Sequence, residues 1–130
     1  MMVLVMMGQD IRELSVALSR DGRVAESKTL AASPESYLRD VATALSDWGV
    51  TLDDLNAVAV VTGPGSFTSS RVSVTIANAI AFAKGIPVIG IPNPERLDIV
   101  ALTVPANLPP ADRFAVPVYD RPPHITAPNP

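Results

Sequence analysis

The fold is decided by the stretch Val58-Ala59-Val60-Val61-Thr62-Gly63-Pro64-Gly65-Ser66-Phe67-Thr68-Ser69-Ser70-Arg71. The β-branched residues and alanines over 57–62 predict a buried strand. Two glycines around a proline end that strand, because glycine permits positive φ and proline cannot donate to a ladder. The Ala/Val/Ile-rich residues that follow predict a helix over 68–84, and residues 86–91 predict a second strand. The stretch is therefore a βαβ unit whose glycine turn opens a helix.

The glycine turn permits two interpretations. Its residues are Gly63, Pro64, Gly65, Ser66, Thr68 and Arg71. In the first, backbone N–H groups at the helix start bind an anion or a partner backbone. In the second, the glycines only allow a tight reversal. A cation near the positive end of the helix dipole favours the first, because Arg71 then needs a carboxylate, phosphate or carbonyl partner. The turn matches neither common nucleotide-binding glycine motif.

The residues before this unit predict three strands and a helix. Residues 2–7, 13–20 and 23–30 read as a meander, with Asp21-Gly22 as a two-residue hairpin turn. Ser33-Pro34 starts a helix that runs to Trp48 and ends at a left-handed Gly49. Residues 51–55 predict a capped single turn. Three strands, helix, strand, helix, strand is a mixed-sheet α/β layout with five strands.

Composition limits the classes of function. The chain has 130 residues, one domain's worth, a net charge of −3 and no cysteine. The basic residues are scattered, so we expect no direct nucleic-acid binding. No apolar run reaches the roughly 18 to 20 residues of a membrane span, and residues 1–7 predict a strand rather than a signal peptide. The absence of cysteine excludes disulfides and thiolate chemistry and suits a cytoplasmic protein.

Two motifs carry a family resemblance. The first is Gly63-Pro64-Gly65-Ser66-Phe67-Thr68, followed after two residues by Arg71, and the second is Ile86-Pro87-Val88-Ile89-Gly90-Ile91. Both resemble motifs of the bacterial TsaB (YeaZ) family, and the order of elements is similar over residues 2–100. The resemblance implies one lobe of the ribonuclease H-like fold shared by actin, sugar kinases and the Hsp70 ATPase domain.

The same resemblance implies a non-catalytic partner in making threonylcarbamoyladenosine (t6A) in tRNA. In that family TsaB supports the catalytic subunit TsaD by pairing helices of its first lobe, and the ATPase TsaE joins the complex. Members also self-associate through these helices. The implied partners are a TsaD-like subunit, a TsaE-like ATPase and, when the chain is alone, a second copy; no cofactor or metal is implied. The partner-binding residues expected here are Ser66, Phe67, Thr68, Ser70, Arg71, Ser73, Val74, Ala77 and Ala81.

The helix over 68–84 is apolar on more than one side, so it should be buried on more than one side. The residues expected to face the sheet are Val72, Ile76, Ala79, Ile80 and Ala83. A stripe of small residues beside them, Ser70, Ser73, Ala77 and Ala81, would let another helix approach closely. That cover is either the helix that starts at Pro34 or another subunit, and a twofold dimer is the expected symmetry.

Composition changes after Ile91, because ten of the thirteen prolines lie from Pro92 onward. We expect a lobe over 1–102, with a short helix within 94–102, and a proline-rich tail over 103–130. The tail is ordered only if Val116, Val118 and Tyr119 pack on the lobe. Residues 115–123 are similar to the C-terminus of TsaB, so the family's second lobe is expected to be missing between the two parts.

Catalytic chemistry finds little support in the residues. The one histidine, His124, lies in the proline-rich tail, and no cluster has metal-ligand spacing. Asp53 and Asp54 are better explained as acids at a helix start than as a catalytic carboxylate pair. Ser66 is better explained as a helix cap than as a nucleophile. Gly8 and Gln9 stand where the family carries an acidic Asp-Thr-Ser triplet.

The chain also differs from the pattern of the TsaB family at three further positions, Ser69, Ser70 and Ser73. The rival interpretation is a small nucleotide-binding or hydrolytic, glycoprotease-like enzyme that uses the turn from Gly63 to Thr68. A third interpretation is a homodimer that is a remnant of the family and no longer has another partner. The absence of an acid at Gly8 and of any general base favours the non-catalytic scaffold over the enzyme.

Overall fold

The protein is described by a computed structural model that places residues 1–102, 104, 108–111 and 113–118. Its centre is a five-stranded sheet in the order β3-β2-β1-β4-β5. The strands are β1 (Met2–Met7), β2 (Glu13–Arg20), β3 (Arg23–Ala31), β4 (Ala57–Gly63) and β5 (Val88–Pro92). Strands β1 to β3 form an antiparallel meander, and β1, β4 and β5 are parallel. This is the predicted mixed-sheet, ribonuclease H-like lobe.

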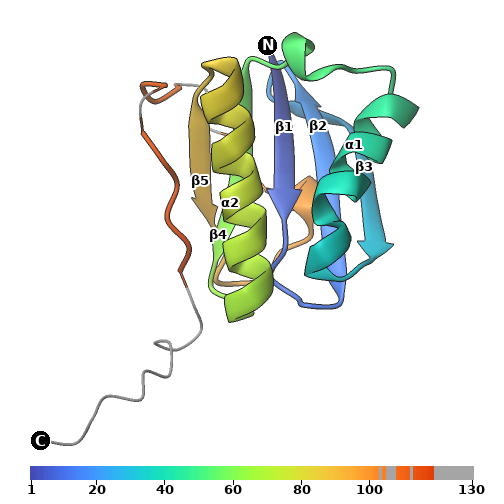
Figure 1. Ribbon diagram of the computed structural model, residues 1–130, viewed down its shortest axis with the longest axis vertical. Helices are drawn as coiled ribbons and strands as arrows, with labels where there is room; N and C mark the ends of the chain where they lie inside the picture. The colour runs from blue at the N-terminus through green and yellow to red at the C-terminus, as the bar shows by residue number, and fades with distance from the viewer. Residues whose placement is uncertain (103, 105–107, 112, 119–130) are drawn as a thin grey trace, which may run out of the picture.

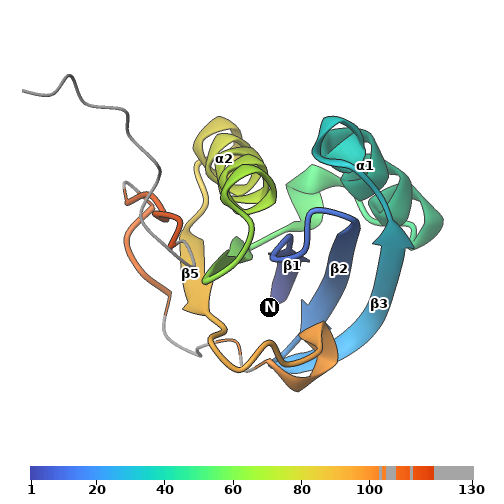
Figure 2. The same ribbon diagram turned by 90° about the horizontal axis from the view of Figure 1, so that it is seen from below.

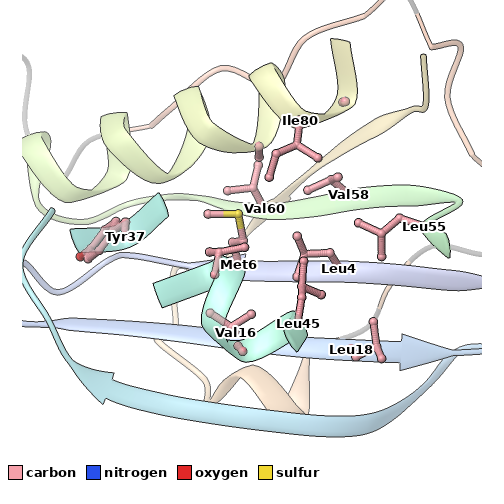
Figure 3. Packing of buried hydrophobic residues seen from close by; sticks show 14 of the residues in the cluster. Leu4, Met6, Val16, Leu18, Tyr37, Leu45, Leu55, Val58, Val60 and Ile80 are labelled. Carbon is pink, nitrogen blue, oxygen red and sulfur yellow. The ribbon is translucent and has the colours of Figure 1, made fainter. Parts of the chain in front are cut away.

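Two helices, α1 (Tyr37–Asp47) and α2 (Phe67–Lys84), cover the same face of the sheet (Figures 1 and 2). Between them and the sheet lies the larger apolar core, in which Leu4, Met6, Val60 and Ile80 meet (Figure 3). A smaller cluster on the opposite face is built from Val5, Ala59, Ile89, Ile99 and their neighbours. Strand β4 is buried along its whole length, as its uninterrupted apolar run predicts.

Most predicted elements are confirmed, and the deviations have local causes. The strand predicted from Ile86 begins at Val88, because the Ile86 N–H donates to the Ala81 carbonyl in the turn that closes α2. The helix predicted from Pro34 begins with a 3-10 turn over Pro34–Ser36, and the Ser33 side chain makes no capping hydrogen bond. Gly49 has the expected positive φ of 68°. The capped turn is Leu52–Asp54, and the helix expected within 94–102 is a single 3-10 turn, Ile99–Ala101.

The chain beyond Leu102 is only partly described, and its division into lobe and tail stays a prediction. Val104 and Leu108 pack against the smaller core cluster, and Ala115 packs against the larger one. The side chains of Val116 and Val118 are exposed, so they do not provide the packing on which an ordered tail was expected to depend. Tyr119 and His124 lie outside the described residues.

Candidate functional site

The carboxyl ends of β1, β4 and β5 converge on a network of two buried amides. The Gln9 side chain donates from Nε2 to the Pro64 carbonyl oxygen at 2.6 Å and to the Asn93 carbonyl oxygen at 2.9 Å. Asn93, only 2% exposed, donates from Nδ2 to Gln9 Oε1 at 2.8 Å and to the Leu97 carbonyl oxygen at 2.9 Å. Neutral groups of the chain itself therefore satisfy the side chain of Gln9, the residue that follows Gly8.

The glycine turn closes tightly over this network. The Ser66 N–H donates to the Gln9 carbonyl oxygen at 2.8 Å, and the Asn93 N–H donates to the Gly63 carbonyl oxygen at 2.8 Å. A Cβ on Gly65 would lie 2.7 Å from the Gln9 carbonyl oxygen, so only glycine fits without a backbone shift. Gly63 has a φ of 124°, a region that side chains rarely adopt. A backbone N–H of the turn thus binds a backbone carbonyl, but this carbonyl belongs to Gln9 of the same chain and not to a partner.

The beginning of α2 is capped as predicted. The Ser66 Oγ accepts a hydrogen bond from the Ser69 N–H at 3.4 Å, which is a capping role and not that of an activated nucleophile. Arg71 lies beyond the first turn, since the helix begins at Phe67, and its side chain is exposed. The dipole argument for an anionic partner of Arg71 is therefore wrong, because the dipole effect fades within the first turn. Among the described residues Arg71 has no hydrogen bond or ion pair.

The predicted assignment of α2 faces is also wrong. Ser70, Ser73, Ala77 and Ala81, expected as a free stripe, are buried within the chain, as is Val74. The residues expected against the sheet are partly or fully exposed except Ile80: they are Val72, Ile76, Ala79 and Ala83. Small side chains are found where α2 lies closest to the sheet and the Gly8 backbone, and the sequence periodicity did not separate the two stripes. Partner contact by the five buried residues stays a prediction, and their burial within the chain gives it no support. The expectation for Ser66, Phe67, Thr68 and Arg71 stays a proposal.

An apolar groove of about 520 Å³, called here the α1–α2 groove, is lined by α1, by the turn that follows it and by Ile80 of α2. Leu38 lies on its rim and is 61% exposed. The lining residues are Leu38, Val41, Ala42, Leu45, Ser46, Gly49, Val50, Thr51, Leu52 and Ile80. Val72 and Ile76 of α2 pack against the same core while staying partly exposed. The groove is therefore built mainly by α1 and the turn after it, while Ile80 is the α2 residue in its lining. The sequence alone did not predict this groove, because it depends on how far apart the helices stand.

Tyr37 anchors the start of α1 to the start of β2. Its hydroxyl donates to the Glu13 carbonyl oxygen at 2.7 Å, and its ring contacts the backbone beside Gly8. Burial raises the pKa of the Tyr37 phenol above its ordinary value of 10.0, and the Ser69 hydroxyl nearby offsets this in part. The Ser69 oxygen itself has no hydrogen-bond partner among the described residues, so we assign it proximity to the phenol and not a bond.

Replacing Tyr37 by phenylalanine tests this anchor. We expect the variant to lose about 1 kcal/mol of unfolding free energy at neutral pH, since the partly buried Glu13 carbonyl loses its donor. The raised phenol pKa stabilises the fold below the unfolded-state pKa of about 10, and this contribution is lost as pH rises through the higher folded-state value. Urea titrations between neutral pH and about pH 11 should therefore show a steeper alkaline loss for the wild type than for Tyr37→Phe. Equal slopes would contradict the buried phenol.

The acidic residues near α1 and α2 have structural partners. Hydrogen bonds from the Thr51 backbone and hydroxyl hold the pKa of the Asp54 carboxyl below its ordinary value. Asp53 pairs with Lys84 at 2.7 Å. Both acids lie in the 3-10 turn Leu52–Asp54, which Asp54 caps, and this placement confirms the helix-start interpretation. Across the described ranges no group of three or more His, Cys, Asp or Glu is placed to hold a metal ion. Within the same ranges, no helix has the length and apolar character needed to cross a bilayer.

Similarity to known proteins extends over most of the folded part. A sequence model of the family described as TsaD, tRNA N6-adenosine threonylcarbamoyltransferase, matches residues 27–109. The tRNA N6-adenosine threonylcarbamoyltransferase of Syntrophus aciditrophicus is 33% identical over 98 residues, which cover 61% of this chain and 29% of that protein. The tRNA threonylcarbamoyladenosine biosynthesis protein TsaB of Escherichia coli is 38% identical over 79 residues, which cover 59% of this chain and 34% of that protein.

A solved structure agrees with these relatives. YeaZ from Pseudomonas aeruginosa superposes with a TM-score of 0.63 at 28% identity, over 71% of this chain and 44% of that one. The chain spans about a third of the length of the curated relatives above. The resemblance to TsaB (YeaZ) that the glycine turn predicts is thereby confirmed.

Proposed function

This chain belongs to the TsaD family of tRNA N6-adenosine threonylcarbamoyltransferase proteins, and from that premise we propose that it serves t6A formation as a non-catalytic partner of a TsaD-like subunit. The observation that carries the proposal is the apolar groove between α1 and α2. A groove lined mainly by aliphatic side chains, with an exposed leucine on its rim, is a surface that a protein partner covers.

The relatives indicate which partner suits this groove. The chain is similar both to TsaB and to a threonylcarbamoyltransferase, so each of these proteins contains a stretch that resembles this lobe. Related lobes carry related helices, and a helix pair can meet its counterpart about a twofold or pseudo-twofold axis. We therefore place the α1–α2 face against the corresponding helices of a TsaD-like subunit. A TsaE-like ATPase would join that complex, and no direct contact with tRNA is proposed.

The amide network supports the non-catalytic role. Gln9 is neutral, and every polar atom of its side chain bonds to the same chain, which leaves it no free group to hold a phosphate or to move a proton. Ser66, the hydroxyl nearest to the turn, caps α2. The rival enzyme would need a charged or proton-accepting group at this turn.

Light scattering tests the pairing. The purified chain is mixed with the threonylcarbamoyltransferase subunit of the same organism, and each protein is also measured alone. We expect a complex whose mass is the sum of one copy of each. A chain that forms only homodimers, with no mixed species, would assign the groove to a second copy. A chain that stays monomeric in every sample would contradict the proposal.

Calorimetry separates the partner from the rival enzyme. Titration of the chain with ATP and Mg²⁺ is expected to give no binding tighter than about 1 mM, which corresponds to roughly −4 kcal/mol. The physical reason is the closed, neutral network at the strand ends. Micromolar binding, or release of phosphate by the chain alone, would favour the nucleotide-binding or hydrolytic enzyme.

A further inference from the structure

The segment from Arg113 to Val118 lies along β5 and the flank of α2 that faces away from α1 (Figures 1 and 2). Asn78 of α2 holds it at Ala115. The Asn78 Nδ2 donates to the Ala115 carbonyl oxygen at 3.0 Å, and the Ala115 N–H donates to Asn78 Oδ1 at 2.9 Å. A single amide side chain thus satisfies both backbone groups of one residue, as a neighbouring strand would.

A second attachment joins the segment to the glycine turn. The Val118 N–H donates to the Thr62 carbonyl oxygen at 2.6 Å, next to the end of β4. A Cβ on Gly63 would collide with the Val118 carbonyl oxygen, so the segment crosses where the chain has no side chain. Gly63 in turn accepts the Asn93 N–H, which belongs to the buried amide network. The segment therefore contacts the first residues of the turn, Thr62 and Gly63, whereas Gln9 contacts Pro64 and Ser66.

Side chains contribute little to this attachment. Phe114, Val116 and Val118 are each at least half exposed, and only Ala115 packs against the core. An extended segment held at two backbone positions, with most of its side chains in solvent, is recognised through its main chain, as in strand addition to a sheet. The sequence of residues 113–118 is thus not what fixes their place.

We propose that residues 113–118 form a strap, that Asn78 is the positioning residue that latches it, and that the latched strap holds the glycine turn of the candidate site in place. The coupling runs from Asn78 to Ala115, along three residues of extended chain to Val118, and from there to Thr62 and Gly63. Release of the strap at Ala115 frees the end of β4, and the hydrogen bonds of Asn93 and Ser66 weaken with it. The strap lies away from the α1–α2 groove, so this coupling does not depend on the proposed partner.

Amide hydrogen exchange on the full chain tests the latch. Asn78→Ala removes both bonds to Ala115, and Asn78→Asp removes only the donor and places a charge beside a carbonyl. We expect the amides of Ala115 and Val118 to exchange at least about tenfold faster in Asn78→Ala, with those of Ser66 and Asn93 accelerated as well. Asn78→Asp should lie between it and wild type. The amides of β1 and β2 should not change, which separates local release from general destabilisation.

The matched control is Thr75→Ala, an exposed position of α2 one turn earlier, which should leave all these amides unchanged. Val116→Ala should also leave them unchanged, because recognition is through the backbone. Two results would overturn the inference. One is unchanged exchange of Ala115 and Val118 in both Asn78 variants, which removes the latch. The other is rapid exchange of the strap with unchanged Ser66 and Asn93, which removes its coupling to the turn. If Asn78→Ala does not fold, Asn78→Asp provides the same comparison.

Discussion

Leu38→Glu is expected to weaken binding of the chain to a TsaD-like subunit at least about 100-fold, or roughly 3 kcal/mol, while leaving the lobe folded. Leu38 is 61% exposed at the rim of the α1–α2 groove, so the free chain tolerates a carboxylate there. In the complex that carboxylate would be buried opposite apolar side chains without a partner, which costs several kcal/mol. Its position in the first turn of α1 even favours an acid.

Phe82→Glu is the matched control. Phe82 is a larger apolar side chain, 77% exposed, one helical turn after Asn78, the residue of α2 that bonds to Ala115, and it is not among the residues that line the groove. The substitution introduces the same charge and removes at least as much apolar surface, so it separates the groove from a general effect of charge. Binding isotherms of wild type and both variants should show a loss for Leu38→Glu alone. Equal losses in both variants, or none in either, would remove the groove from the proposed interface.

The replacement of Ala77 by glutamate, which the sequence would suggest as an interface test, cannot serve. Ala77 has no exposed surface within the chain itself. A carboxylate there would be buried against the sheet, so loss of a complex would follow from loss of the fold. The partner-binding surface has to be probed on the rim of the groove.

Asn93→Ala is expected to lower the free energy of unfolding by about 3 kcal/mol. The substitution removes two donated bonds, to Gln9 Oε1 and the Leu97 carbonyl oxygen, and one bond accepted from the Leu97 N–H. A buried group left without its partner costs about 1 to 3 kcal/mol. Neighbouring bonds share a network, so the losses do not add fully.

Asn56→Ala controls for the loss of an amide. Its Oδ1 accepts one hydrogen bond from the Met2 N–H at 2.7 Å at an exposed position, so we expect a loss below about 1 kcal/mol. Guanidinium titrations of wild type and both variants measure the difference. If Asn93→Ala costs no more than Asn56→Ala, the amide network does not lock the strand ends, and the support it gives to a non-catalytic role is lost.

The sequence predicted the sheet and its connections well because its signals are local. The alternation in residues 13–20, the Asp21-Gly22 turn and the apolar run of β4 each specify a conformation from a few neighbouring residues. The serine cap at Ser66 and the paired acids after Thr51 were predicted for the same reason. The capping contacts of Ser66 and Asp54 join residues three apart along the chain, whereas the Asp53–Lys84 ion pair is long-range.

The features that were missed are long-range. Asn78 and Ala115 are 37 residues apart, and Gln9 and Asn93 are 84 apart, so no local pattern marks either pair. An asparagine before a proline, as at Asn93, reads as an ordinary turn residue. The faces of α2 were assigned wrongly because alanine and serine suit both a buried close contact and a free stripe. The short distance between α2 and the Gly8 backbone, which no local pattern encodes, decides which stripe is buried.

The most direct test of the central claim is the amount of t6A formed in tRNA incubated with a threonylcarbamoyl donor and three protein samples. The samples are the chain alone, the threonylcarbamoyltransferase subunit of the same organism alone, and the two together, each with the TsaE-like ATPase present. Nucleoside mass spectrometry measures the product. A non-catalytic partner predicts no t6A from the chain alone and at least about tenfold more from the pair than from the subunit alone. Formation of t6A by the chain without the subunit, or no gain when the chain is added, would contradict it.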